Sequence, residues 1–220
     1  MKNVRIWYTK DGSCRYISHL DVNRAMMRAL QMSEIPLWHT EGFNSRLYVS
    51  FALPLSLGFC GMYESVDVKL LDDDYSFDEV KTNLNKCLPV GLSAFDVTEP
   101  VMKPTVITYA HFIIVIRAEK HDNAEILSAA KKLLDREEIL VEKKTKKGKI
   151  KQVNLKENIV KYSIENSRDG VILDITLPAG NTVNVNPTLF TDVLEKECGF
   201  ELFIDVTRKE LFDERFALFK

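Results

Sequence analysis

The chain has 220 residues, of which 45% are hydrophobic, and this is enough apolar surface to fill one large or two small cores. Its 30 Lys and Arg residues and 32 Asp and Glu residues leave a formal net charge of −2. That balance excludes the global basic field of a dedicated nucleic-acid-binding protein, so any binding of nucleic acid would use a local patch.

The N-terminal part of the chain begins with a predicted strand and a predicted helix. Residues 4–8 alternate between apolar and polar side chains, as in a half-buried strand, and a turn follows at residues 10–12. Ser18 is a predicted N-cap, and Asp21 stands three residues later, in the position of a capping box. Apolar residues at helical spacing then extend the predicted helix to about Met32.

Further strands and a second helix complete this first part. Regular alternation predicts strands at residues 47–53 and 66–70. Ser76 and Glu79 open the second capped helix, and residues 92–97 supply the last strand. The resulting order, β-α-β-β-α-β, is that of the ferredoxin-like split unit.

The pattern begins again after Pro100 and Pro104, which mark a predicted hinge. A strand at residues 109–116 precedes a helix that Asp122 and Glu125 cap. Later strands are predicted at residues 139–144, 149–155, 159–164, 171–177 and 200–206, with a helix from Asn186-Pro187 to Gly199 before the last of them. We therefore predict an α+β protein of two ferredoxin-like (βαββαβ) modules, residues 1–104 and 105–220, the second with an extra hairpin.

The cysteines and the apolar runs bear on the compartment. Cys14, Cys60, Cys87 and Cys198 lie far apart without a C-x-x-C pair, and the first residues lack an apolar signal core, so we expect a cytoplasmic protein of a reducing compartment. No apolar run approaches the roughly 20 residues of a membrane span, so no membrane is expected as a partner. The histidines have no metal-ligand spacing, and the sequence predicts neither a metal nor another cofactor.

Two polar loops are the best candidates for a binding site. Residues 15–21 join a strand to a helix N-terminus, residues 41–46 lead into the next strand, and a βαβ-type arrangement would bring two such loops together. Because a helix N-terminus presents unpaired N–H groups, nearby arginines would suit a phosphate or carboxylate. The candidate substrate-binding or anion-binding residues are Arg15, Ser18, Asp21, Arg24, Gly42, Phe43, Asn44 and Arg46. The structural alternative is that Ser18 and Asp21 only cap the helix and that Asp21 pairs with Arg24.

Three motifs in these regions resemble one protein family. They are R-Y-I-S-H-L-D at residues 15–21, G-F-N-S-R-L-Y-V-S-F-A-L-P-L-S-L-G at residues 42–58 and Y-E-S-V-D-V at residues 63–68. Their order and spacing resemble those of the radical SAM-associated proteins. Genes of that family lie beside, or are fused to the C-terminal end of, radical SAM enzymes that often carry a cobalamin-binding region. The resemblance is dense over residues 3–100 and weak beyond them.

The chain departs from the family pattern in two places. Family members commonly have G-F-N-P and then His-Pro, where this chain has Ser45 and then Arg46-Leu47, so no role for a histidine is carried over there. The family's Asp-Ile-Arg-Pro stretch corresponds to V-N-L-K at residues 153–156.

The resemblance implies an accessory role. A radical SAM enzyme holds its cluster with closely spaced cysteine thiolates, which this sequence lacks. The chain therefore resembles the standalone subunit that binds substrate for a radical SAM protein encoded nearby. The gene neighbourhoods of the family include RNA-processing and ribosomal functions, which makes modification of RNA (tRNA or rRNA) the implied reaction.

A run of lysines around Gly148 is a second candidate contact with RNA. It consists of Lys143, Lys144, Lys146, Lys147, Lys149 and Lys151. This much local charge is enough to hold a phosphate backbone. The alternative is an ordinary solvated hairpin tip, since no aromatic residue interleaves with the lysines for base stacking.

Two rival classes of function stay open. His19 is the best candidate for the acid–base catalyst of a freestanding endoribonuclease, because histidine titrates near neutral pH and this one stands beside Arg15 and a capped turn. Paired ferredoxin-like modules also occur in CRISPR repeat-processing nucleases, which is an analogy of architecture. The alternatives are that His19 only packs or caps, and that the protein is an interaction module without a ligand of its own.

Aromatic residues of the first module are candidate stacking positions. Trp7 stands between Ile6 and Tyr8, and Tyr48 stands between Leu47 and Val49, so both are predicted on the other face of the sheet, which a binding module would use. An aromatic segment near the end of the sequence would equally cover that face or dock a partner. It contains Phe212, Phe216, Leu218 and Phe219.

Overall fold

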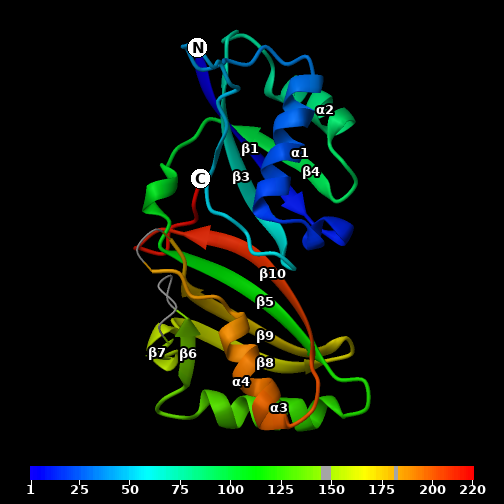
Figure 1. Cartoon of the computed structure of the whole chain (residues 1–220), viewed down its shortest axis with the longest axis vertical. Helices are drawn as coiled ribbons and strands as arrows, with labels where there is room; N and C mark the ends of the chain where they lie inside the picture. Colours follow the sequence, from blue (N-terminus) through cyan, green and yellow to red (C-terminus); the bar gives the residue numbers. More distant parts are fainter. Residues whose placement is uncertain (145–149, 181–182) are drawn as a thin grey trace. The chain divides into compact units, whose positions relative to one another are not determined.

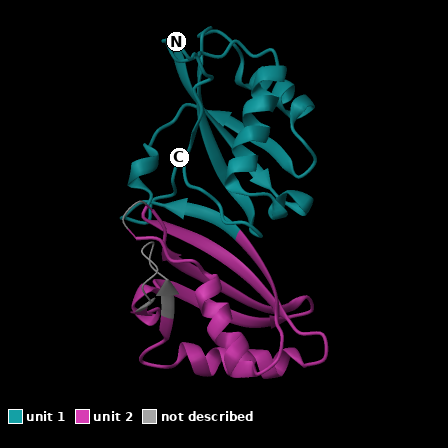
Figure 2. Ribbon diagram, in the orientation of Figure 1, with its two compact units in different colours: residues 1–107, 208–220 teal, residues 108–207 magenta. Residues whose placement is uncertain are grey.

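The structure of the chain is a computed structural model that describes residues 1–144, 150–180 and 183–220. These residues form two compact units (Figure 2). Unit 1 contains residues 1–107 and 208–220, and unit 2 contains residues 108–207.

The division between the units differs from the sequence-based one at the C-terminal end. Residues 208–220 belong to unit 1, whereas the sequence places them in the second module. The reason is the strand β10 (Phe203–Phe212), which continues beyond the predicted stretch 200–206. Its first half belongs to unit 2 and its second half to unit 1.

Unit 1 combines a sheet with two α-helices (Figure 1). The strands are β1 (Lys2–Lys10), β2 (Ser50–Phe51), β3 (Cys60–Leu70) and β4 (Leu92–Thr98). They run in the order β4-β1-β3-β10, with β2 also paired to β3. The helices are α1 (His19–Met32) and α2 (Phe77–Cys87), and two 3-10 turns are η1 (Gly12–Tyr16) and η2 (Pro104–Val106).

Alternation along the strands decides which side chains face the helices. Val4, Ile6 and Tyr8 of β1 are buried in the same core as Val22 and Met26 of α1. Fully burying such a side chain contributes about 1.5–3 kcal/mol, so this face holds the helices on the sheet. The other face of the unit 1 sheet, which we call the outer face, carries the intervening side chains. They are Asn3, Arg5 and Trp7 of β1 and their partners across the ladder on β3, Lys69, Asp67 and Ser65.

The strand predicted at residues 47–53 is reduced to β2. Leu47 forms a bridge with His39 instead of continuing along β3. On the other side, Pro54 has no N–H for a ladder, and the carbonyls of Leu53 and Pro54 accept hydrogen bonds from the Arg208 side chain. The segment at residues 52–59 therefore leaves the sheet as a loop.

Helix starts lie where the capping residues predict them. The Ser18 hydroxyl accepts a hydrogen bond from the Asp21 N–H at 3.2 Å and begins α1. Ser76 and Glu79 form a complete capping box at the start of α2. In unit 2, Asp122 caps α3 (Asn123–Leu134), and Gly199 ends α4 (Thr188–Cys198) in the left-handed region, at φ 73°.

In unit 2 the strands of the sheet run in the order β10-β5-β9-β8. Its strands are β5 (Tyr109–Arg117), β8 (Lys161–Ser167), β9 (Gly170–Pro178) and the first half of β10. A separate pair consists of β6 (Leu140–Lys144) and β7 (Ile150–Asn154), and the short turn η3 (Lys156–Asn158) follows it.

The α+β class predicted from the sequence is confirmed. The chain contains both α-helices and β-strands, and the ladders β1-β3, β1-β4, β2-β3, β5-β9, β8-β9 and β6-β7 are antiparallel. Over the described ranges 1–144, 150–180 and 183–220, no helix combines the length and the apolar character that crossing a membrane requires.

Candidate functional site

The polar side chains of the turn between β1 and α1 form hydrogen bonds with one another. Ser18 caps α1, and its hydroxyl also donates to the Asp21 carboxylate at 2.6 Å. That bond lowers the pKa of Asp21, with a smaller contribution from Arg24, whose guanidinium lies 3.3 Å from the same carboxylate. Three of the predicted anion-binding residues are therefore engaged with one another. This is the structural alternative that the sequence left open.

Arg15 ties this turn to the loop at residues 52–59. Its Nε donates to the carbonyl of Gly58 at 3.0 Å, and the N–H of Gly58 donates to the carbonyl of Arg15 at 2.7 Å. The guanidinium also lies over the Tyr16 ring, 5.4 Å from its centroid. The first motif and the second half of the second motif thus meet, and together they form one rigid corner of unit 1.

Three charged side chains are buried near this corner. Arg208 of β10 forms a bidentate ion pair with Glu64 of β3, at 2.9 and 2.5 Å. Lys10 is equally buried, and its ammonium donates to the carbonyls of Arg15 and Ile17, at 3.4 and 3.2 Å. Burial lowers the pKa of Lys10, and the charge of Glu64 opposes that shift. With two cations against one carboxylate, these three side chains carry a net positive charge.

His19 is the first residue of α1, and it faces this buried charge. Its ring lies edge-on to Phe51, with the centroids 5.2 Å apart. Burial lowers the pKa of His19; the negative charge of Glu64 raises it, while the positive charges of Arg208 and Lys10 lower it further. Within the described part of the chain, no group hydrogen bonds to its ring nitrogens. The net result is a lowered pKa of the imidazole, for which burial is the largest cause.

The loop at residues 41–46 lies at the other end of unit 1 and not beside the turn. Trp38 and Tyr48 flank this loop in the sequence, and the Tyr48 N–H donates to the Trp38 carbonyl. Leu37 bridges Leu70 at the end of β3, whereas the turn follows the pairing of Lys10 with Gly61 at the start of β3. Leu70 lies nine positions beyond Gly61 along β3, which is about 30 Å of extended strand.

The prediction of one joint site is therefore wrong. The hairpin that residues 37–48 form extends β3 at its far end, so Gly42, Phe43, Asn44 and Arg46 are exposed there, away from the N-terminus of α1.

Half of the lysines predicted to contact RNA lie outside the residues that the structure describes. Lys146, Lys147 and Lys149 lie outside the described residues. Lys143 and Lys144 of β6 and Lys151 of β7 are placed only as strand positions. Their role in binding RNA stays a prediction.

A second group of polar and aromatic residues gathers on the outer face. Trp38 and Tyr48, at the base of the hairpin, have ring centroids 5.8 Å apart. The Lys69 ammonium lies over both rings, at 4.7 and 4.9 Å from their centroids. Cations bind aromatic faces through the ring quadrupole. The outer face therefore has a cationic aromatic edge beside the hairpin.

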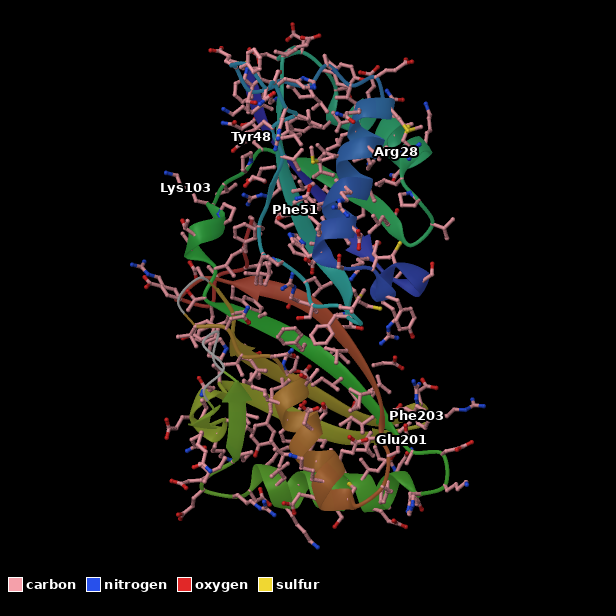
Figure 3. All side chains as sticks on the ribbon, viewed as in Figure 1. Arg28, Tyr48, Phe51, Lys103, Glu201 and Phe203 are labelled. Atoms are coloured by element: carbon pink, nitrogen blue, oxygen red, sulfur yellow. The ribbon has the colours of Figure 1, made fainter. Side chains whose placement is uncertain are left out.

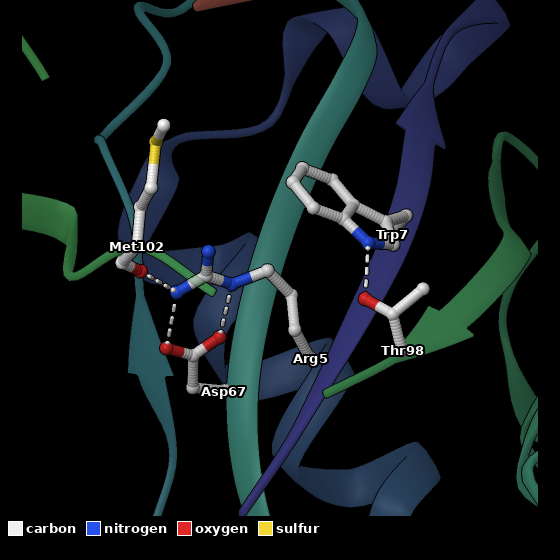
Figure 4. Close-up of polar contacts among 5 residues, drawn as sticks. All are labelled: Arg5, Trp7, Asp67, Thr98 and Met102. Atoms are coloured by element: carbon white, nitrogen blue, oxygen red, sulfur yellow. Dashed lines mark hydrogen bonds and ion pairs between the residues drawn. The ribbon is translucent and has the colours of Figure 1, made fainter. Parts of the chain in front are cut away.

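Arg5 is the central charged residue of the outer face (Figure 4). Its Nε and Nη2 donate to the Asp67 carboxylate at 2.7 and 2.8 Å, and Nη2 also donates to the Met102 carbonyl at 2.9 Å. The remaining nitrogen, Nη1, is buried without a hydrogen-bond partner among the described residues. The Ser65 hydroxyl is also buried without a hydrogen-bond partner among these residues.

The aromatic segment near the end of the sequence covers part of the outer face. Phe219 is buried, with its ring 5.9 Å from that of Trp7 and 4.3 Å from the Arg5 guanidinium carbon. Trp7 also contacts Tyr63, at a centroid distance of 4.4 Å, and donates from Nε1 to the Thr98 hydroxyl. Of the two alternatives for this segment, the structure shows the covering one. Trp7 is consequently buried.

A pocket of about 490 Å³ opens on the outer face beside this cover. Its lining includes Arg5, Asp67, Tyr48, Ser50 and Lys103. Figure 3 shows Tyr48 and Lys103 on the side of unit 1 away from α1. Ligand pockets in proteins commonly have volumes of roughly 300–1,000 Å³. The size and the polar lining therefore suit a small ligand or one unit of a polymer.

Sequence reasoning placed Tyr48 on this face but missed Arg5, Asp67 and Lys103. The signal was a charged residue inside each apolar strand, as in Val4-Arg5-Ile6 and Val66-Asp67-Val68. Residues of that parity share one face of a sheet, so a pair of opposite charges there indicates a built polar surface. For metals, the described residues contain no cluster of three His, Cys, Asp or Glu side chains that could hold an ion.

One protein-family model matches residues 3–187, and its description is "Uncharacterized protein conserved in bacteria (DUF2344)". The chain belongs to this family. No curated protein matches the DUF2344 chain.

Among solved structures, the DUF2344 chain is similar to a chain in "Crystal Structure of a Cbf5-Nop10-Gar1 Complex", with a TM-score of 0.52 and 9% identity. The alignment covers 96% of this chain and 50% of that chain, so the DUF2344 chain spans half the length of its match. At this identity the likeness shows the fold alone. A second match, "Crystal Structure of an Unknown Protein from Galdieria sulphuraria", has 14% identity and covers 94% and 98% of the two chains, but its TM-score of 0.29 supports no argument.

Proposed function

We propose that this chain is an accessory subunit that binds substrate for a radical SAM enzyme, with RNA as the substrate. The resemblance of three ordered motifs to the radical SAM-associated proteins supports the link to such an enzyme. In this proposal the corner formed by residues 15–21 and 52–59 contacts the partner protein, and the subunit contributes binding and not the radical chemistry.

The observation that carries the proposal is the exposure of apolar side chains on a rigid corner. Tyr16 is 70% exposed, Leu57 is 63% exposed and Leu20 is 57% exposed. Tyr16 and Leu57 are chain neighbours of Arg15 and Gly58, which bind each other through two hydrogen bonds. Large apolar side chains that the fold itself does not bury are typical of protein-interaction surfaces, and a rigid support lowers the entropy lost on binding.

The fold is compatible with a binding subunit. Unit 1 has the order β4-β1-β3-β10 with β2 also paired to β3, and unit 2 has the order β10-β5-β9-β8 with β6 and β7 apart. We interpret both as ferredoxin-like modules, the second with the inserted hairpin. In such modules the helices cover one face of the sheet, which leaves the other face for a ligand.

A pull-down tests the partner. Replacing Tyr16 and Leu57 together by serine is expected to lower recovery of a radical SAM protein by about tenfold or more, since central apolar contacts carry most of the energy of an interface. The measurement is mass spectrometry of proteins that copurify with the tagged chain from its host.

The matched control is Met32→Ser, because Met32 has a similar exposure of 58% but lies at the far end of α1. Recovery equal to wild type is expected for this variant. If the double variant and the control recover the same amount of radical SAM protein, the corner is not the contact. If no radical SAM protein copurifies with the wild-type chain, the accessory role itself is wrong.

A second candidate function, an endoribonuclease that uses His19, is favoured by one observation, the lowered pKa of that imidazole beside buried positive charge. An NMR titration should place its midpoint below the ordinary range of histidine. Because the unfolded chain then binds the proton more tightly, the stability due to His19 is complete above the unfolded pKa and is lost as the pH falls toward the folded pKa. Cleavage of RNA that disappears in a folded His19→Ala variant would favour the nuclease over the accessory role.

A further inference from the structure

We propose that the outer-face pocket is a nucleotide site, which takes a phosphate at Arg5 and Lys103 and a base against Tyr48. The same chemistry, a phosphate with a planar base, is offered by single-stranded RNA and by a free mononucleotide. The choice of RNA as the source of the nucleotide rests on the proposed function. The assignment of the pocket as a nucleotide site is independent of that function.

The charges that surround the pocket favour a phosphate. Lys103 and Arg5 line it, and Lys69 lies at its aromatic edge. The single carboxylate of this group, Asp67, is already paired through two hydrogen bonds with Arg5. With Arg5 and Asp67 compensating each other, Lys69 and Lys103 leave a local positive charge in a chain whose formal net charge is −2. Hydrogen bonds from Arg and Lys to phosphate are among the stronger ones in proteins.

One of the residues that line the pocket carries an unpartnered buried donor. Over the described ranges, the buried side-chain atoms without a hydrogen bond are Arg5 Nη1 and Ser65 Oγ. Arg5 lines the pocket, whereas Ser65 lies on the same face opposite Trp7 and does not line it. Leaving a buried donor unpaired is costly, and charged donors cost more, so such groups indicate a site that is built to receive a partner.

The aromatic edge suits a base. Tyr48 lines the pocket, and its ring is held by Trp38 on one strand of the hairpin and by Lys69 on β3. A ring fixed in this way loses little freedom when a base stacks on it, and base–aromatic stacking tolerates any sequence. The same hairpin carries the fully exposed Phe43 at its tip, where a further base of a single strand would stack.

Fluorescence anisotropy with a labelled oligouridylate, together with competition by UMP, tests the site. Tyr48→Ala is expected to weaken binding of the oligonucleotide about tenfold through the loss of stacking. Lys103→Ala is expected to weaken it by about the same factor and to reduce the salt dependence of log K by about one. Tyr48→Phe keeps the ring and should bind like wild type.

The control is Lys86→Ala, which removes an exposed lysine of α2 on the helix side of unit 1. Because Lys103 is exposed and Tyr48 only half-buried, these variants should keep the thermal unfolding midpoint of wild type. Equal affinity of Tyr48→Ala, Lys103→Ala and Lys86→Ala would overturn the nucleotide site. Binding of UMP without binding of the oligonucleotide would overturn RNA as the source. A failed pull-down of a radical SAM protein would remove the proposed function and leave these affinities unchanged.

Discussion

Replacing Glu64 with glutamine is expected to lower the free energy of unfolding of unit 1 by about 3–5 kcal/mol. Arg208 is only 4% exposed, and in the folded protein its charge is met by the Glu64 carboxylate, at 2.9 and 2.5 Å. An amide of the same shape keeps some hydrogen bonding but leaves the guanidinium charge uncompensated. Breaking one partner of a buried ion pair is costly for this reason, even where the intact pair adds little net stability.

The two tryptophans provide the measurement. Both Trp7 and Trp38 belong to unit 1, so fluorescence-detected urea unfolding reports this unit without interference from unit 2. The matched control is Glu197→Gln in unit 2. Its carboxylate also forms a bidentate pair with an arginine, Arg136, but the two side chains are 40% and 47% exposed. A surface pair contributes about 0–1 kcal/mol, so only a small change in the unfolding of unit 2, followed by circular dichroism, is expected.

A double replacement separates the loss of the pair from the burial of a lone charge. Glu64→Leu combined with Arg208→Met removes both charges, and it should recover a large part of the stability lost in Glu64→Gln. A double variant that is as unstable as Glu64→Gln would assign the loss to another cause. The obvious one is the pair of hydrogen bonds from Arg208 to the carbonyls of Leu53 and Pro54, which hold the loop at residues 52–59.

The elements of this fold that the sequence predicts well are those with local causes. Ser18, Ser76 and Asp122 each begin a helix where the capping pattern places it, because a cap is satisfied within one turn. The predicted strand at residues 47–53 shrinks to Ser50–Phe51 because a contact from outside the segment competes with the ladder. Arg208 lies 155 residues from Leu53 in the sequence, and its guanidinium donates a hydrogen bond to the Leu53 carbonyl.

The candidate sites also divide into features with local causes and features that depend on contacts between distant parts of the chain. Local spacing was enough to recognise the turn at residues 15–21. It did not show that the Arg15 side chain donates to the Gly58 carbonyl or that the Asp21 carboxylate accepts from the Ser18 hydroxyl. The pocket needs Arg5 opposite Asp67, a pairing across 62 residues that depends on strand register. It also needs the segment that carries Lys103, which has no periodicity of its own. Register and loop placement are set by tertiary packing, and a single sequence does not encode them in any local pattern.

Replacing Phe219 with alanine is expected to destabilise unit 1 by about 3 kcal/mol, near the lower end of the range for removing a buried phenylalanine ring. Phe219 is buried against Trp7 and the Arg5 guanidinium. Its segment returns to β10 through a bridge between Phe212 and Leu218 and through the hydrogen bond from the Phe219 N–H to the Leu211 carbonyl. Because the segment lies outside the regular elements, it relaxes into a cavity more easily than a helix or central strand, which reduces the cost of that cavity.

The test of the Phe219→Ala variant again uses tryptophan fluorescence. Removal of the ring exposes Trp7 to water, so a red shift of the native emission should accompany the lower unfolding midpoint. Phe43→Ala is the control, since Phe43 is fully exposed in the same unit and its loss should change neither quantity. A Phe219→Ala protein with native emission and stability would mean that the segment does not cover the outer face in solution. Trp7 would then be open to a ligand, and the nucleotide site would extend from the pocket onto the rings of Trp7 and Tyr63.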